Sequence, residues 1–150
     1  MDIVDLVFGT FPSWSRLFVR LALGLVFFAH GAQKVFGWFW GPGLKGTIGY
    51  FRQALGIPAA AAVLAALIEC FGGLAVFVGF LSRPAALGLI VVMLVAIVKV
   101  HAKNGFFINW TLTPGQGHGF EFNLVLIAMA LSILVGGAGS FSIDRLFLAW

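Results

Sequence analysis

The chain has 150 residues, of which 61% are hydrophobic and only 9% are charged, and its mean hydropathy is +1.08. A soluble domain needs a polar shell that so few charged residues could not build, so the composition excludes a soluble globular protein and predicts an integral membrane protein. The formal net charge is +4. The basic residues are scattered rather than clustered, which excludes a nucleic-acid patch and favours contact with membrane lipid.

Four apolar segments are long enough to cross a bilayer as helices, which takes about 20 residues each. We therefore expect an all-α fold, a four-helix bundle in a single membrane domain over residues 1–150. The very short turn after the second segment makes the second and third helices antiparallel neighbours, with Pro84 expected at the first position of the third helix. The predicted spans are residues 16–37, 58–80, 84–101 and 119–136.

Two long connections join these spans, at residues 38–57 and 103–118. The first begins with a helix-breaking Gly-Pro-Gly sequence at 41–43, after which apolar side chains recur at helical spacing over residues 47–55. This pattern predicts a short amphipathic helix in the membrane interface between the first two spans. We expect both connections to cover the same mouth of the bundle, with aromatic side chains above the histidines.

Glu69 lies in the middle of the second predicted span. An acid there costs a few kcal/mol and normally faces a protein interior or a watery cavity. No capping or snorkelling interpretation reaches the middle of a helix. We therefore expect Glu69 within contact distance of at least one of Arg20, His30 and His101, as its compensating charge.

Ionisable side chains from all four spans fall in one layer of the bundle. At about 1.5 Å per helical residue, this layer lies about 16 to 25 Å from the side of the termini. Burying such groups unpaired would be prohibitive, so the sequence predicts a polar site there. The members of the layer are His30, Glu69, Lys99, His101 and Glu121, with Lys34 one turn beyond His30.

Simpler interpretations stay open for the other members of the layer. Lys34 could snorkel to the interface, His101 could be a helix-end histidine, and Glu121 could be stabilised by the N-terminus of the fourth helix. Four glycines, at 24, 31, 72 and 73, are expected to let helices approach closely.

Cofactor signatures are absent from the sequence. Cys70 is the single cysteine, which excludes an internal disulfide relay, a multi-cysteine metal site and an iron–sulfur cluster. No haem or flavin motif is recognisable, and no metal site is predicted. Electron chemistry would therefore have to use a bound quinone or the cofactor of a partner protein.

A series of short motifs runs along the chain in a fixed order: Arg20 to Gly24; His30, Gly31 and Lys34; Glu69, Gly72, Gly73, Gly79 and Arg83; His101, Gly105, Phe106 and Phe107; Gly119, Phe120 and Glu121; and Gly139, Ser142 and Asp144. In these motifs and their order the sequence resembles the DoxX family. This resemblance implies a small bacterial four-helix membrane protein with a quinone-linked redox role, often in a complex with a soluble redox protein.

Two hypotheses of different classes follow. In the first, Glu69 and Glu121 are catalytic groups that handle protons, while a quinone or small polar ligand is bound by other side chains of the layer. In the second, the protein is a non-enzymatic membrane module that binds lipid or partner proteins, and its polar cluster only fixes helix packing. The ligand-binding residues of the first hypothesis are His30, Lys34, His101 and Arg20.

Location and assembly are less constrained. Tryptophans at both predicted interfaces fit an even number of crossings, which puts both termini on the same side of a bacterial inner membrane. We expect that side to be the cytoplasm, although the basic residues divide almost evenly and do not fix the orientation. Small bundles with Gly and Phe faces are compatible with homo-oligomers.

Overall fold

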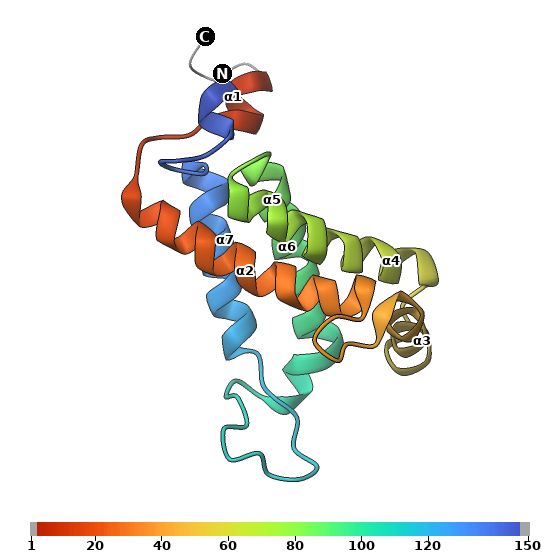
Figure 1. Cartoon of the computed structure of the whole chain (residues 1–150). Helices are drawn as coiled ribbons and strands as arrows, with labels where there is room; N and C mark the ends of the chain where they lie inside the picture. Colours follow the sequence, from red (N-terminus) through yellow and green to blue (C-terminus); the bar gives the residue numbers. More distant parts are fainter. Residues whose placement is uncertain (1–2, 148–150) are drawn as a thin grey trace.

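The computed structural model describes residues 3–147, and within this range the fold is all helical, with no strand (Figure 1). Three helices are long and apolar enough to cross a membrane: Trp14–Phe36, Ala59–Val78 and Ser82–Asn104. A shorter apolar helix, Glu121–Gly136, follows. These bounds lie within a few residues of the four predicted spans, so the expected helical membrane bundle is confirmed.

The first part of the chain contains three helices. α1 (Ile3–Phe8) precedes α2 (Trp14–Phe36), whose N-cap Ser13 accepts a hydrogen bond from the Arg16 amide. α2 ends where Gly37 adopts a left-handed conformation, with φ of 73°. The short helix predicted between the first two spans is present as α3 (Gly43–Leu55).

Each of the next two long helices contains a π-helical turn. The second span runs through α4 (Ala59–Leu67), the π turn η1 (Ile68–Gly72) and α5 (Gly73–Val78). The third runs through α6 (Ser82–Ala96), the π turn η2 (Ile97–His101) and the 3-10 turn η3 (Ala102–Asn104). Such turns are frequent at functional sites, and here they carry Glu69, Lys99 and His101.

The remaining helices are α7 (Glu121–Gly136) and the 3-10 turn η4 (Asp144–Phe147). η4 returns to the end of the molecule that holds α1, where the rings of Phe8 and Phe147 lie 4.9 Å apart. α3 and the loop over residues 105–120 lie away from this terminal end (Figure 1).

The start of α6 differs from the prediction, because the helix begins at Ser82 and Pro84 occupies its third position. The carboxylate of Asp144, from η4, accepts hydrogen bonds from the backbone amides of Leu81 (2.7 Å) and Ser82 (2.9 Å). A residue about sixty positions away thus caps the helix, and no local pattern around Pro84 could reveal it.

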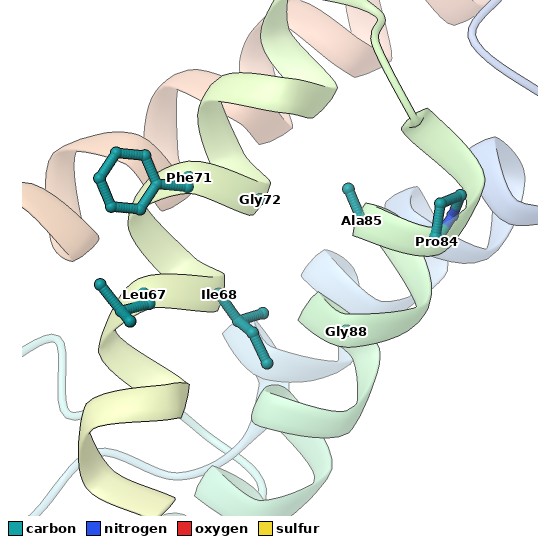
Figure 2. A pocket seen from close by; sticks show the side chains of 7 residues that line it. All are labelled: Leu67, Ile68, Phe71, Gly72, Pro84, Ala85 and Gly88. Atoms are coloured by element: carbon teal, nitrogen blue, oxygen red, sulfur yellow. The ribbon is translucent and has the colours of Figure 1, made fainter. Parts of the chain in front are cut away.

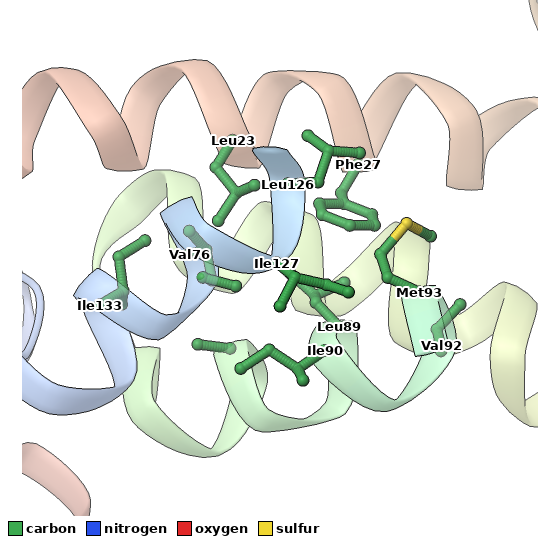
Figure 3. Close-up of a cluster of buried hydrophobic side chains, with 12 residues drawn as sticks. Leu23, Phe27, Val76, Leu89, Ile90, Val92, Met93, Leu126, Ile127 and Ile133 are labelled. Atoms are coloured by element: carbon green, nitrogen blue, oxygen red, sulfur yellow. The ribbon is translucent and has the colours of Figure 1, made fainter. Parts of the chain in front are cut away.

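The core lies between two helix pairs. α2 packs on α5 and η1, while α6 packs on α7, and the two pairs diverge at the end away from the termini (Figure 1). Buried apolar side chains from α2, α5, α6 and α7 fill the region where the pairs cross (Figure 3). The largest buried members are Leu23, Phe27, Val76, Leu89 and Ile133.

Three of the four glycines selected from the sequence permit close helix contact. A Cβ atom at Gly31 would collide with the backbone of Cys70, one at Gly24 would lie 2.6 Å from the Phe77 amide nitrogen, and one at Gly73 would meet the chain at residues 27–28. Gly72 differs, because a Cβ there would have only ordinary contacts, the nearest 3.6 Å from Leu89 Cδ2. It faces α6 rather than α2.

Candidate functional site

A cavity of about 750 Å³ occupies the space between the diverging helix pairs. Its walls come from α2, α4, α6 and α7, and side chains of α3 and of the loop 105–120 complete it. The predicted contribution of both long connections to this end of the bundle is therefore confirmed. The residues contributed by the two connections are Tyr50, Phe51, Leu55, Ile57, Ile108, Trp110, His118 and Gly119.

The cavity wall includes a buried ion pair between α2 and η1. The Lys34 ammonium donates a hydrogen bond to Oε2 of Glu69. Glu69 is only 3% exposed, whereas the Lys34 side chain is 27% exposed. The expectation that Glu69 faces the protein interior is confirmed, but its compensating charge is Lys34 rather than Arg20, His30 or His101. The stem of Lys34 reaches Glu69 instead of snorkelling to the interface.

Three histidines and a second lysine line the same cavity: His30 on α2, Lys99 and His101 on η2, and His118 in the loop. Nδ1 of His101 lies 2.9 Å from the backbone carbonyl oxygen of His118. Since a carbonyl can only accept, Nδ1 carries the hydrogen, and Nε2 is left as the other polar atom of the ring. Asn104 also donates to this carbonyl, at 3.0 Å, so two side chains at the end of the third long helix hold the loop.

Asn123 on α7 is a cavity residue that the sequence reasoning missed. It is buried, and its amide nitrogen lies 3.3 Å from the sulfur of Met93. The amide oxygen of Asn123 has no hydrogen-bond donor among residues 3–147, so it is an acceptor available at the cavity wall. A search for uncharged polar residues inside the apolar spans, rather than for charges alone, would have found it.

Two of the predicted site residues lie elsewhere. Arg20 is 2% exposed and donates through Nη2 to the carbonyl of Phe141, at 2.8 Å, in the buried cluster near the termini that also contains Asp144. Glu121 lies in the first turn of α7 and does not line the cavity. Depth along the helix axis was a good guide for the other members of the layer, but it carries no information on the direction of a side chain.

The charges of the cavity are unbalanced. Two lysines face one glutamate, so the described part of the wall has a net charge of +1 before any histidine is protonated. Most of the polar groups are hydrogen-bond donors. They lie within a much larger apolar surface formed by residues such as Phe27, Leu64 and Leu126. This arrangement suits a largely apolar ligand that carries hydrogen-bond-accepting oxygens at one end.

Apolar helices long enough to span a membrane, two diverging helix pairs and polar side chains in a largely apolar cavity define the class: a small helical membrane protein with a cavity between its helices. The DoxX family model matches residues 15–102, which include Arg20, His30, Lys34, Glu69 and His101. The chain belongs to the DoxX family. The match does not extend to Glu121 or to the C-terminal segment, so it covers less of the chain than the motif resemblance suggested.

Three relatives cover most of the chain. "Uncharacterized membrane protein Rv3486" of Mycobacterium tuberculosis is 35% identical, over 89% of this chain and 88% of its own. "Inner membrane protein YqjF" of Escherichia coli is 30% identical, over 87% of this chain and 89% of the relative's length. "Putative oxidoreductase CatD" of Bacillus subtilis is 28% identical, over 85% of this chain and 83% of the relative's length. No solved structure matches the chain.

Proposed function

We propose that the protein is a quinone-binding component of an oxidoreductase in the bacterial inner membrane. The observation that carries this proposal is the cavity itself, in which the Lys34–Glu69 pair and the three histidines are set in a largely apolar wall. The name of the Bacillus subtilis relative points to the same class of activity. The name of the Escherichia coli relative supports the inner membrane as the location.

The chemistry of the wall fits a quinone head group. A quinone has two carbonyl oxygens that accept hydrogen bonds and an apolar ring, and the cavity offers donors from lysine and histidine beside aromatic surface from Phe51 and Trp110. A small hydrophilic ligand would leave most of the apolar wall in contact with water, which disfavours it.

The polar residues have distinct proposed roles. Lys34 donates to one ligand oxygen and His30 to the other, while Nε2 of His101, whose Nδ1–H is bonded to the His118 carbonyl, donates to the ligand only when the ring is protonated. A bound quinone accepts two electrons and two protons when it is reduced, so a dry site needs groups that deliver protons. The histidines line the cavity and are placed to do this, and the Glu69 carboxylate beside them can receive a proton and pass it on, whereas Glu121 is not part of the proposed site.

The source of the electrons is proposed to be a soluble redox protein that docks at the membrane surface. We further propose four crossings with both termini in the cytoplasm, so that α3 and the loop 105–120 lie at the opposite interface. Exposed tryptophans at 38, 40 and 110 support an interfacial position for this end.

Ligand retention and stability, measured on the same samples, test the proposal. Native mass spectrometry of the detergent-purified protein should show a retained quinone, and added quinone should quench tryptophan fluorescence, since Trp110 lines the cavity. His30→Ala is the cleanest variant, because His30 makes no side-chain hydrogen bond or ion pair within residues 3–147. Its melting temperature should stay at the wild-type value while quinone retention falls.

The opposite pattern would support the alternative, a non-enzymatic module with a structural polar cluster. In that case wild-type protein would retain no quinone, or His30→Ala would lower ligand retention only together with the melting temperature. Glu69→Gln provides a second comparison, because it keeps size and hydrogen bonding but removes the charge that accepts a proton.

A further inference from the structure

A second hollow lies beside the cavity, on the surface between the second and third long helices. It is an open groove of about 350 Å³ between the α4–η1 segment and the start of α6 (Figure 2). Among residues 3–147, no charged or polar side chain lines it. The lining residues are Leu67, Ile68, Phe71, Gly72, Pro84, Ala85 and Gly88.

Ile68 belongs to both hollows, so the groove and the cavity meet at this side chain. Figure 2 shows Ile68 pointing from η1 toward α6, into the space between the two helices. The next residue along the chain is Glu69, whose carboxylate faces the cavity. Both hollows lie between the same two long helices, so a path from one to the other runs past Ile68 and crosses no helix.

The groove exists because glycines face each other across it. Gly72 on η1 and Gly88 on α6 have no side chains, and Ala85 adds only a methyl group (Figure 2). At Gly88 a Cβ would lie 3.1 Å from Cγ2 of Ile68, so the isoleucine occupies the space that this glycine leaves. At Gly72 a Cβ would have ordinary contacts only, whereas every other glycine selected from the spans is used for close helix contact. Gly72 thus keeps the groove free rather than bringing helices together.

We propose that this groove is the subsite for the apolar tail of the cavity ligand, a polyprenyl chain attached to the quinone head. The inference rests on the proposed function, because the head must occupy the cavity for the tail to reach the groove. The occupant is a chain rather than a folded partner, since the groove is small and uncharged and adjoins the cavity at Ile68. The exposed apolar side chains of Leu67 and Phe71 border the groove, so the tail can leave it into the bilayer.

The test compares two quinones that share one head group, of which one carries a polyprenyl tail and the other a methyl group in its place. Dissociation constants for both are measured by fluorescence quenching on wild-type protein and on Gly72→Leu, which adds an apolar side chain to the groove. Leucine is a better helix former than glycine, and its Cβ would have only ordinary contacts at this position, so the variant should fold. Ala85→Leu fills the groove from the opposite wall and serves if Gly72→Leu does not fold.

A matched control is Gly49→Leu on α3, where a Cβ would have no atom within 4 Å and the groove is not affected. The wild type and this control should bind the tailed quinone more tightly than the tailless one. In Gly72→Leu and Ala85→Leu this preference should be lost, with the affinity for the tailless quinone unchanged. Both quinones partition into the same detergent in every sample, so partitioning cancels when variants are compared.

The outcomes separate the two proposals. If wild-type protein binds neither quinone, the head site fails and the proposed function fails with it. If both quinones bind but the wild type shows no preference, or the groove variants keep the wild-type preference, the head site stands and the tail subsite is wrong.

Discussion

The Lys34–Glu69 pair should respond asymmetrically when its two members are removed in turn. Glu69 is only 3% exposed, whereas the Lys34 side chain is 27% exposed and has a long flexible stem. After Glu69→Gln, the ammonium of Lys34 can keep a hydrogen bond to the amide oxygen or move toward the interface. After Lys34→Met, the Glu69 carboxylate is left buried without its partner.

The different exposure of the two side chains sets the expected loss in the free energy of unfolding for each variant. Removal of one member of a buried pair typically costs about 3 to 5 kcal/mol, and Lys34→Met should lie in that range. Glu69→Gln should cost only about 1 to 2 kcal/mol, because the partner stays hydrogen-bonded and partly solvated. The double variant Lys34→Met with Glu69→Leu removes both charges and should be more stable than Lys34→Met alone.

Thermal and denaturant unfolding of the four proteins in one detergent measures these differences, with helical circular dichroism as the signal. A protein with Val135→Ala, an exposed position on α7, is the control for an unrelated change in a span. Equal losses for Glu69→Gln and Lys34→Met, or a double variant less stable than Lys34→Met, would refute the reasoning. Either result would mean that burial of Glu69 does not dominate the energetics of the pair.

Three further outcomes are expected. Gly31→Ala should lower the free energy of unfolding by about 1 to 3 kcal/mol, because the added methyl group would collide with the Cys70 backbone. The loss is measured as a lower melting temperature, and an unchanged melting temperature would contradict this close contact. Asp144→Ala should cost about 1 to 3 kcal/mol by the same assay, since two backbone amides of the α6 N-terminus lose a charged acceptor, and Asp144→Asn should recover part of the loss. In His101→Ala the His118 carbonyl of the loop 105–120 loses its hydrogen bond from the His101 ring. Limited proteolysis should therefore cleave this loop faster than in the wild type, and equal cleavage rates would show that His101 does not hold the loop.

The sequence was sufficient to predict the helical elements. Apolar segments of the right length gave the spans, and helical spacing after a Gly-Pro-Gly sequence gave α3. These are local properties, because a backbone in lipid must satisfy its hydrogen bonds within a helix, whatever the helix packs against. The π-helical turns at Glu69 and His101 were not predicted, since the residues that form them have ordinary helix-forming character.

Site residues were predicted less completely. The cost of an acid in an apolar span singled out Glu69, and depth predicted His30 and His101 in the same layer; in the structure all three line one cavity. The assignment of the compensating charge was wrong, because depth along an axis does not say which way a side chain points. Arg20 turns toward the segment after α7, and Lys34 turns toward Glu69.

By itself, the sequence determined that this protein lies in a membrane, where its helices run and which carboxylate must be compensated. Only the tertiary structure decided which cation does so, that Asp144 caps α6, and that Gly72 opens a groove where Gly31 closes a helix contact. The physical reason is the range of the interactions. Hydrophobic length and helix formation depend on neighbouring residues, whereas ion pairs, long-range caps and cavities depend on how helices far apart in the chain are rotated and packed.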